Sequence, residues 1–370
     1  MFSRRSVRAV WSYTLAALVA VGSGLCFGAR ASAAEGEPTL VAKGRVLYAR
    51  YCQLCHAEGG TGYAADHAPS LVSPMFLTAA SDAFIARGIR SGRPHTAMAA
   101  YGKGRGGPLD DAQIDAIVAY LRSLGPQAIA LPESKAAGNV ARGAALFARR
   151  CSSCHGSAKQ RGEAPDLRNP EFLAAASPAF LRHSIQHGRP PTRMPAFDQK
   201  LSAAEIEDLV TWLGSLPTQP SVAPRTPPDV SGKDLPVLRY PKGKVPQFTL
   251  RDDRFVSADQ VKQALEAKQR FILLDARAPS DWFEAHLPGA LPTPYYDTAK
   301  LDRIPNDGTW VVAYCACPHH ASGAVVDALR QRNYPHTAVL DEGILFWRDH
   351  GFPLEGAAVG AGAAPTPARK

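Results

Sequence analysis

The chain has 370 residues, of which 45% are hydrophobic and 20% are charged, and its formal net charge is +9 at pH 7. The length exceeds that of one ordinary domain, so we expect a multidomain protein. The basic residues form no stripe with interleaved aromatic residues, which excludes a nucleic-acid-binding protein.

Residues 1–33 have the features of an export signal. A basic start is followed by an apolar run from about residue 10 to residue 27 and by the small-residue cleavage site Ala31-Ser32-Ala33. We therefore expect this signal peptide to be removed and the mature chain to be periplasmic, with no stable membrane span after cleavage. The alternative is an uncleaved leader that anchors the protein, but the run is short for a span and two glycines interrupt it.

Two copies of the motif C-x-x-C-H occur in the chain, at Cys52–His56 and at Cys151–His155. The spacing suits c-type haem, because two thiols on one helical turn form thioethers with the haem vinyl groups and the adjacent imidazole reaches the iron. A zinc site would need four converging ligands, a redox dithiol would not need the histidine, and duplication excludes chance. The motifs predict two covalently attached haems, bound by Cys52, Cys55, Cys151 and Cys154.

The two motifs belong to an internal repeat. After each motif the same landmarks follow in the same order: a proline-bearing loop, a Gly-Arg-Pro turn and a methionine. The matched positions are Cys52 with Cys151, Ala68–Leu71 with Ala164–Leu167, Gly92–Pro94 with Gly188–Pro190, and Met98 with Met194. We therefore expect each half to form one complete unit.

Each half is predicted to close with an amphipathic helix, because apolar residues recur there at the spacing i, i+3, i+4, i+7. These residues are Ile114, Ile117, Val118 and Leu121 in the first half and Ile206, Leu209, Val210 and Leu213 in the second. A capping box precedes each helix, formed by Asp110 with Gln113 and by Ser202 with Glu205.

Both halves resemble class I c-type cytochrome domains, over residues 38–130 and 135–216. The shared features are a helix that enters C-x-x-C-H, a proline-bearing loop, a methionine loop and a C-terminal helix. The resemblance implies two all-α domains in which each motif histidine is the proximal iron ligand and has a loop proline near it. These pairs are His56 with Pro69 and His155 with Pro165.

The same resemblance implies that Met98 and Met194 supply the sixth iron ligands. A thioether opposite an imidazole raises the reduction potential, as an electron carrier requires. The sequence Met194-Pro-Ala-Phe fits the distal loop of the family closely, whereas Met98-Ala-Ala-Tyr fits it less well, and His95 could replace Met98. Met75 is interpreted as a packing residue, and His183 and His187 as solvated or propionate-side residues.

The composition changes at residues 217–250, which are rich in Pro, Ser, Thr and Lys and lack periodicity, so we expect a semi-rigid linker there. Beyond it, short apolar runs alternate with helical patterns, which predicts a small parallel α/β domain. The expected strands are 271–275, 310–314 and 337–341, and the expected helices are 258–268, 279–285 and 321–332.

Residues 251–356 resemble a rhodanese domain, and residues 357–370 are expected to form a flexible tail. The resemblance rests on spaced motifs in the right order: Leu274–Arg277, His286–Ala290, Tyr314-Cys315, Leu340–Gly343, Trp347 and Gly351–Pro353. It implies that the loop 315–321 carries a persulfide on the catalytic residue Cys315.

The place of Cys315 between a strand and a helix favours a reactive thiol. Loop N–H groups and a helix N-terminus stabilise a thiolate, which can attack sulfane sulfur or hold the resulting persulfide. Three features depart from the family pattern: Pro318 lacks an N–H group, His320 stands where arginine is frequent, and Cys317 either attacks a persulfide or is a bystander. The loop is therefore either a working sulfur carrier or part of a fold used only for binding.

These features indicate a periplasmic dihaem cytochrome that transfers electrons and handles a small inorganic sulfur compound at Cys315, a coupling that rests on fusion alone. Its partners are expected to be redox proteins of the periplasm. Residues 135–216 hold eleven basic and seven acidic residues, and such basic residues can pair with haem propionates. The alternatives are an electron carrier whose rhodanese domain docks a partner, and a sulfurtransferase enzyme with the cytochromes as an electron outlet.

Overall fold

The computed structural model describes residues 39–65, 67–158, 160–218, 235–316 and 319–359, which belong to one compact unit. The predicted signal peptide, residues 219–234 of the predicted linker and the chain from residue 360 lie outside the described residues. Among the helices of the described part, none is long and apolar enough to cross a bilayer.

The first part of the described chain is entirely helical apart from loops and follows the predicted repeat. The first helical segment (residues 39–125) contains α1 Leu40–Tyr51, α2 Gln53–His56, α3 Pro74–Ala79, α4 Asp82–Ser91 and α5 Asp111–Ser123, with short 3-10 turns at Glu58–Gly60 and Lys103–Arg105. The second helical segment (residues 138–216) contains α6 Val140–Arg150, α7 Ser152–His155, α8 Pro170–Leu173, α9 Pro178–His187 and α10 Ala203–Ser215. The all-α prediction for this region is confirmed.

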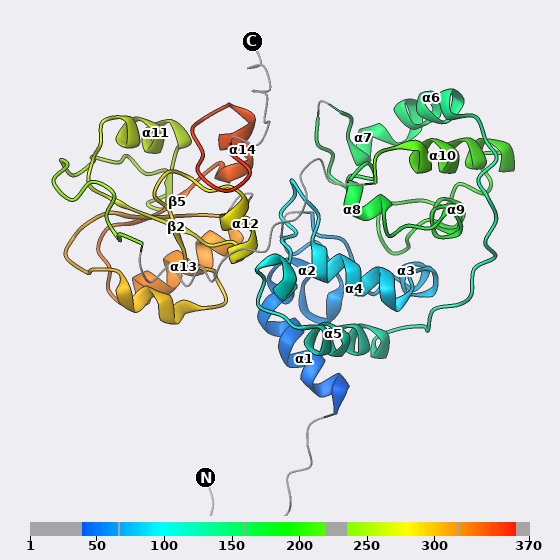
Figure 1. Cartoon of the computed structure of the whole chain (residues 1–370), viewed down its shortest axis with the longest axis horizontal. Helices are drawn as coiled ribbons and strands as arrows, with labels where there is room; N and C mark the ends of the chain where they lie inside the picture. The colour runs from blue at the N-terminus through cyan, green and yellow to red at the C-terminus, as the bar shows by residue number, and fades with distance from the viewer. Residues whose placement is uncertain (1–38, 66, 159, 219–234, 317–318, 360–370) are drawn as a thin grey trace, which may run out of the picture. The chain divides into compact units, whose positions relative to one another are not determined.

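The first and last helices of each segment cross at a glycine. A Cβ atom on Gly44 of α1 would lie 1.8 Å from the carbonyl oxygen of Ala116 on α5, and one on Gly143 of α6 would lie 2.0 Å from that of Asp208 on α10. Only glycine permits such an approach. The crossings, which can be followed in Figure 1, fix the direction in which α1 and α6 enter the C-x-x-C-H turns.

The two closing helices start at the capping boxes that the sequence predicts. The side chain of Asp110 accepts a hydrogen bond from the backbone of Gln113, whose side chain accepts one from the Asp110 backbone, and Ser202 and Glu205 form the same pair. The apolar stripes of α5 and α10 are at most 5% exposed. Both helix predictions are confirmed.

The two helical segments pack against each other through equivalent positions of the repeat. The hydroxyl of Ser73 donates to the carbonyl oxygen of Pro190 at 2.8 Å, and the amide of Asn169 donates to that of Pro94 at 2.9 Å. Ser73 corresponds to Asn169 and Pro94 to Pro190, so the contact has the reciprocal form of a two-fold interface. We call it the segment contact.

The last part of the described chain, the sheet segment (residues 248–356), is an α/β unit. Its strands are β1 Phe255–Val256, β2 Ile272–Asp275, β3 Leu291–Pro292, β4 Val311–Tyr314 and β5 Thr337–Leu340, in the spatial order β1-β5-β4-β2-β3, and all pairs are parallel. Its helices are α11 Ala258–Glu266, α12 Pro279–Glu284, α13 His320–Gln331 and α14 Gly343–Asp349, with a 3-10 turn at Thr298–Arg303. The predicted parallel α/β fold is confirmed.

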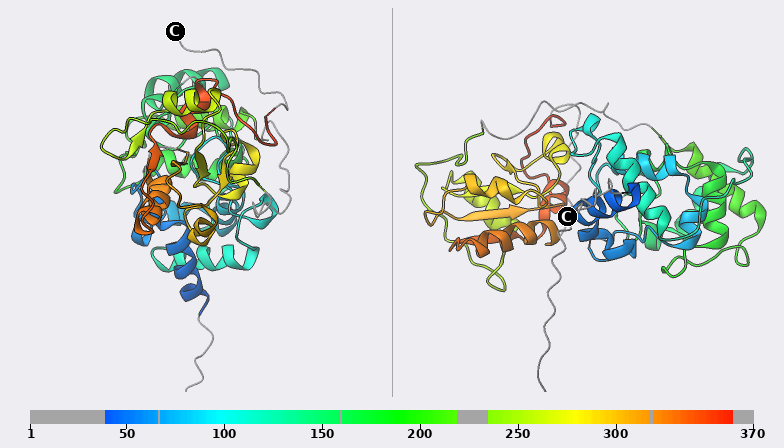
Figure 2. Two further views of the ribbon diagram at one scale, coloured as in Figure 1. Left: turned by 90° about the vertical axis from the view of Figure 1, so that its left-hand side faces the viewer. Right: turned by 90° about the horizontal axis from the view of Figure 1, so that it is seen from below.

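Helices cover both faces of this sheet, as alternation along buried strands requires. One face packs on α11 and α14 through Leu273, Val312, Tyr314 and Leu340. The other packs on α13 through Ile272, Leu274, Val311 and Val339. Figure 1 shows α11 and α14 on one side of the sheet and α13 on the other, and in Figure 2 all strands fall in the part coloured from yellow-green to orange.

Candidate functional site

Each motif histidine is oriented by the carbonyl group of a loop proline. Nδ1 of His56 lies 2.9 Å from the Pro69 oxygen, and Nδ1 of His155 lies 2.7 Å from the Pro165 oxygen. Because a carbonyl oxygen only accepts, Nδ1 carries the hydrogen and the lone pair is on Nε2. Burial lowers the pKa of both imidazoles, which favours the neutral form that binds metals.

The four motif cysteines follow the entering helices directly. Cys52 and Cys151 cap α1 and α6, and the second thiol of each pair lies in the next turn, on α2 or α7. None of them forms a disulfide with another described cysteine. Burial, together with the neighbouring thiol, raises the pKa of Cys52 to about 12 and that of Cys151 to about 11, so both remain protonated at neutral pH.

The loops that carry the predicted methionine ligands have the same backbone geometry. The N–H of Arg93 donates to the Met98 oxygen at 2.7 Å, and the N–H of Arg189 donates to the Met194 oxygen at 3.0 Å. The glycine before each arginine has a positive φ, 64° and 63°, and a Cβ there would lie 2.5 Å from the backbone of the same loop. The repeat therefore presents both methionines in the same way.

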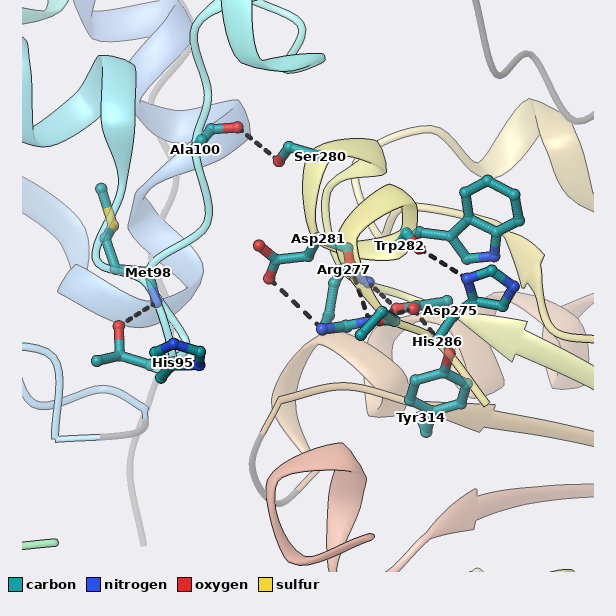
Figure 3. A network of polar contacts seen from close by, with 12 residues as sticks. His95, Met98, Ala100, Asp275, Arg277, Ser280, Asp281, Trp282, His286 and Tyr314 are labelled. Atoms are coloured by element: carbon teal, nitrogen blue, oxygen red, sulfur yellow. Dashed lines mark hydrogen bonds and ion pairs between the residues drawn. The ribbon is translucent and has the colours of Figure 1, made fainter. Parts of the chain in front are cut away.

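His95, the alternative to Met98, lies on the same loop (Figure 3). Its Nδ1 is 3.1 Å from the guanidinium of Arg348 on α14. Since a guanidinium only donates, Nδ1 is the acceptor, and the ring is held toward the sheet segment. Met98 remains the predicted ligand.

The two histidines of α9 face each other, with ring centroids 4.4 Å apart. Nε2 of His183 is buried and has no hydrogen-bond partner among the described residues, and burial lowers the pKa of that ring. His187 ends the helix. Met75, interpreted above as a packing residue, lies half-buried on α3.

The donor groups of each helical segment fit a c-type haem. Two thiols lie on adjacent turns, an imidazole offers a free Nε2 behind an Nδ1 hydrogen bond, and a loop of fixed geometry offers a thioether. These are the groups that covalent attachment and axial ligation of haem require.

Cys315 lies at the end of β4 and is 4% exposed. Its Sγ is 3.2 Å from the hydroxyl oxygen of Ser322 on α13. The carbonyl oxygens of Cys315 and Ala316 accept from the N–H groups of Ile344 and Leu345, at 3.0 and 3.2 Å, which ties the loop to α14. Cys317 and Pro318 lie outside the described residues, so the predictions made for them stay predictions.

The histidine that precedes α13 contacts the ends of two strands. Nε2 of His319 is 2.8 Å from a carboxylate oxygen of Asp341, and its ring lies over Phe255 at 4.1 Å between centroids. Its backbone has a φ of 91°. His319 thus joins the loop to the ends of β5 and β1.

A buried ionic network lies at the carboxyl ends of β2 and β4 (Figure 3). The carboxylate of Asp275 accepts from the Tyr314 hydroxyl at 2.7 Å and from the Arg277 guanidinium at 2.6 Å. Arg277 also donates to the carbonyl oxygen of Ala285 at 2.6 Å. The motif Leu274–Arg277 therefore fixes the turn from β2 to α12, and sequence reasoning had used it only as a family signature.

The sheet segment contacts the first helical segment at the carboxyl ends of its strands, and we call this contact the junction. The hydroxyl of Ser280, after β2, donates to the carbonyl oxygen of Ala100 at 2.7 Å (Figure 3). The hydroxyl of Tyr295, after β3, donates to that of Tyr51 at 2.7 Å. The contact between Arg348 and the predicted haem loop, described above, belongs to the same junction.

Aromatic rings fill the junction. The rings of Tyr51 and Tyr296 are 4.8 Å apart between centroids, and the hydroxyls of Tyr101 and Tyr295 are 3.4 Å apart. In addition, α2, which carries C-x-x-C-H, is in contact with α13. The sequence pair Tyr295-Tyr296 in a loop was the only signal of this contact, and sequence reasoning missed it.

The junction brings the predicted haem site of the first segment to the edge that carries Cys315. Tyr51 precedes Cys52, and Ala100 lies two residues after Met98. Cys315 follows β4, whose carboxyl end lies at the same edge as those of β2 and β3 because the strands are parallel. Parallel α/β sheets bind ligands at this edge.

Two family models match the chain. The model described as "Cytochrome C oxidase, cbb3-type, subunit III" matches residues 39–121 and 138–213, and the "Rhodanese-like domain" model matches residues 257–350.

Curated relatives match the cytochrome region. A "Cbb3-type cytochrome c oxidase subunit CcoP" from Azospirillum sp. (strain B510) is 31% identical over 194 residues, which cover 48% of this chain and 62% of the relative. A "Cbb3-type cytochrome c oxidase subunit FixP" from Bradyrhizobium sp. (strain ORS 278) is 33% identical over 196 residues, which cover 49% and 64%. The chain thus spans less than two thirds of the length of these relatives. Among solved structures, a rhodanese-like domain from Anabaena sp. is 26% identical over 31% of this chain and 87% of that chain, with a TM-score of 0.27.

Proposed function

We propose that this chain, which joins a c-type cytochrome region in two segments to a rhodanese-like domain, is a periplasmic dihaem cytochrome whose electron transfer is coupled to sulfane-sulfur binding or transfer at Cys315. The observation that carries the coupling is the junction, where the loops around the first predicted haem meet the edge of the sheet that bears Cys315.

In this proposal each helical segment holds one haem. Cys52 and Cys55 attach the first haem and Cys151 and Cys154 the second, with His56 and His155 as proximal ligands and Met98 and Met194 as sixth ligands. The haems supply one-electron exchange. The chain supplies the orientation: the carbonyl groups of the loop prolines fix both imidazoles, and the Gly-Arg-Pro turns fix both methionine loops.

Two alternative reactions are proposed for Cys315, one with thiosulfate and one with hydrosulfide, and each balances in atoms and electrons. With thiosulfate, the thiolate attacks the outer sulfur, the S–S bond of thiosulfate breaks, and sulfite leaves with the bonding electron pair, so that a persulfide remains on Cys315. With hydrosulfide, a new S–S bond forms between the two sulfur atoms and releases one proton and two electrons. Two one-electron haems accept that number of electrons.

The cytochrome region is expected to pass electrons to a protein redox partner of the periplasm. Relatives of this region are named as subunits of a cbb3-type cytochrome c oxidase and of a cytochrome bc1 complex, which supports exchange with a protein partner.

The haem content is tested first. Mass spectrometry of the mature protein should show two covalently attached haems and an N-terminus near Ala34. A single haem would contradict the assignment of one segment, and an intact leader would contradict the export signal.

The coupling is tested by adding hydrosulfide to the oxidised protein and following haem reduction by absorbance, because the hydrosulfide reaction releases electrons; thiosulfate, whose sulfur transfer releases none, is used to measure sulfur uptake alone. The intact protein should be reduced faster than the Cys315→Ser variant, and Cys317→Ser shows whether the second thiol attacks the persulfide. Sulfur uptake without any dependence of haem reduction on Cys315 would show two independent functions. No uptake at all would favour the docking role of the rhodanese-like domain, for which the junction is also a basis.

A further inference from the structure

Two buried arginines lie at the segment contact, at equivalent positions of the repeat. Each guanidinium is held between a ring of its own segment and a ring of the other segment, and the two rings around Arg93 are equivalent in the repeat to the two rings around Arg189. The distances to ring centroids are 5.9 Å to Phe84 and 6.0 Å to Phe172 for Arg93, and 5.2 Å to Phe180 and 5.0 Å to Phe76 for Arg189. These contacts are reciprocal between the two segments, as are the hydrogen bonds of the segment contact.

Neither arginine has a carboxylate of its own among the described residues. The hydrogen bonds of their guanidinium groups go to neutral acceptors, the Gly92 oxygen at 2.9 Å and the Ser184 hydroxyl at 2.7 Å. Glu171, which acts on Arg93 electrostatically, already forms ion pairs with two other arginines. Burial lowers the pKa of Arg93 and of Arg189 to about 10. A desolvated charge of this kind is strongly unfavourable unless an anion accompanies it.

The two arginines also adjoin the predicted haem sites. Their backbone N–H groups donate to Met98 and Met194, as described above. Gly88 on α4 leaves room for the Arg93 guanidinium, since a Cβ at Gly88 would lie 3.1 Å from it.

We propose that Arg93 and Arg189 bind the propionate carboxylates of the two haems. The inference rests on the proposed haem content. A guanidinium matches a carboxylate in charge and shape, and haem brings two carboxylates into each segment.

The test is a potentiometric titration of the Arg93→Gln and Arg189→Gln variants. Loss of a positive charge near a haem favours the ferric state, so each variant should lower one of the two midpoint potentials at pH 7. The expected change is about tenfold in the ratio of oxidised to reduced haem, or about 59 mV for one electron. Haem methyl resonances in proton NMR spectra should assign the two shifts to different haems.

The pH profile separates propionate binding from mere packing. Without its arginine, a propionate takes up a proton as pH falls through the weakly acidic range, so the lowered potential should rise again toward low pH. The other titratable groups near these sites are Glu171 and Arg87 beside Arg93, and His183 and His187 beside Arg189. Their contribution is present in the unmodified protein and cancels in the comparison.

Two further variants complete the test. Arg93→Lys keeps the charge and should keep the potential at pH 7, but a propionate held by a single ammonium should titrate at a higher pH than in the unmodified protein. Arg90→Gln removes an exposed charge from α4, the helix that precedes Arg93, and should shift the potential of neither haem. Haem is counted in every variant, so a failure of the proposed haem content is seen separately. Unchanged potentials and pH profiles in the Arg93→Gln and Arg93→Lys variants would overturn the inference.

Discussion

At the scale of single residues, the sequence and the structure leave two candidates for the sixth ligand of the first predicted haem, Met98 and His95. Met98 and Met194 occupy loops with the same backbone hydrogen bonds, which favours the same role for both. The His95 ring accepts a hydrogen bond from Arg348, and this contact occupies one of its two nitrogens.

We expect both haems to show the weak near-infrared band that arises from sulfur-to-iron charge transfer. Met194→Ala should remove the part of the band intensity that comes from one haem, and Met98→Ala should remove the part that comes from the other. The reason is that no second thioether lies on either loop. Absorbance of the oxidised protein measures this. If the unmodified protein shows the band of only one haem, and Met98→Ala leaves that band unchanged, the sixth ligand of the first haem is His95.

Asp281 on α12 gives a prediction about pH. Its carboxylate lies 3.7 Å from the Arg277 guanidinium and is 22% exposed, and burial raises its pKa to about 6. The unfolded value is about 3.9, so the folded state binds the proton more tightly. The contribution of Asp281 to the free energy of unfolding should therefore fall as pH rises from about 4 to about 6, by about 1–2 kcal/mol after allowance for solvent.

Asp281→Asn should abolish this loss of stability between pH 4 and pH 6, as measured by denaturant unfolding followed by circular dichroism. The exposed Asp253→Asn is the matched control and should keep the pH dependence. Identical pH profiles for the two variants would contradict the assignment to Asp281.

At the scale of elements, the two helix crossings depend on the absence of a side chain. Gly44 and Gly143 lie inside helices, where alanine is usually better than glycine by about 1 kcal/mol. Here a Cβ would lie 2.0 Å or less from a carbonyl oxygen of the partner helix, so replacing either glycine by alanine should lower the free energy of unfolding.

Gly44→Ala should lower the free energy of unfolding by about 3 kcal/mol, because the helices must separate to admit the methyl group. Gly214 of α10 is the matched control: a Cβ atom there would have no other atom within 4 Å, and Gly214→Ala should stabilise by about 0.5–1 kcal/mol. Thermal unfolding should show a lower unfolding temperature for Gly44→Ala and a higher one for Gly214→Ala than for the unmodified protein. A stable Gly44→Ala protein would show that the α1 crossing is looser than the glycine contact implies.

Element prediction succeeded where a pattern was long enough to repeat. The stripes of α5 and α10 have four apolar residues each and a capping box, and β2, β4 and β5 are buried runs of four residues. The strands β1 and β3 have two residues each, too few to show alternation. Their pairing with neighbours far along the chain, not a local pattern, creates them.

At the scale of the whole molecule, the junction is the feature on which the proposed coupling depends. Hydroxyl groups of the sheet segment donate to backbone carbonyls beside both halves of the first predicted haem site, at Tyr51 and at Ala100. Removal of these donors should weaken the contact and leave the haem ligands untouched.

The double variant Ser280→Ala with Tyr295→Phe should slow sulfur-dependent haem reduction by about tenfold, since electron transfer falls steeply when two sites move apart and each lost hydrogen bond costs about 1 kcal/mol. Both haem potentials should stay unchanged. Tyr334→Phe removes a hydroxyl that donates to the Ile304 carbonyl elsewhere in the sheet segment, and serves as the control. Equal reduction rates in the double variant and the control would show that the junction is not the electron path.

The sequence alone determined the chemistry that short local patterns carry. Two C-x-x-C-H motifs, their methionine loops and the cysteine after a buried strand predict haem attachment, haem ligation and a thiol loop, because each prediction needs only a few residues at fixed spacing. The repeat and the strand–helix alternation determined the fold classes. Tertiary structure decided which distant residues are in contact. Examples are the arginines between the segments, the tyrosines at the junction and the contact of His319 with Asp341. These contacts join residues far apart in the chain, and packing, which no local pattern records, selects them.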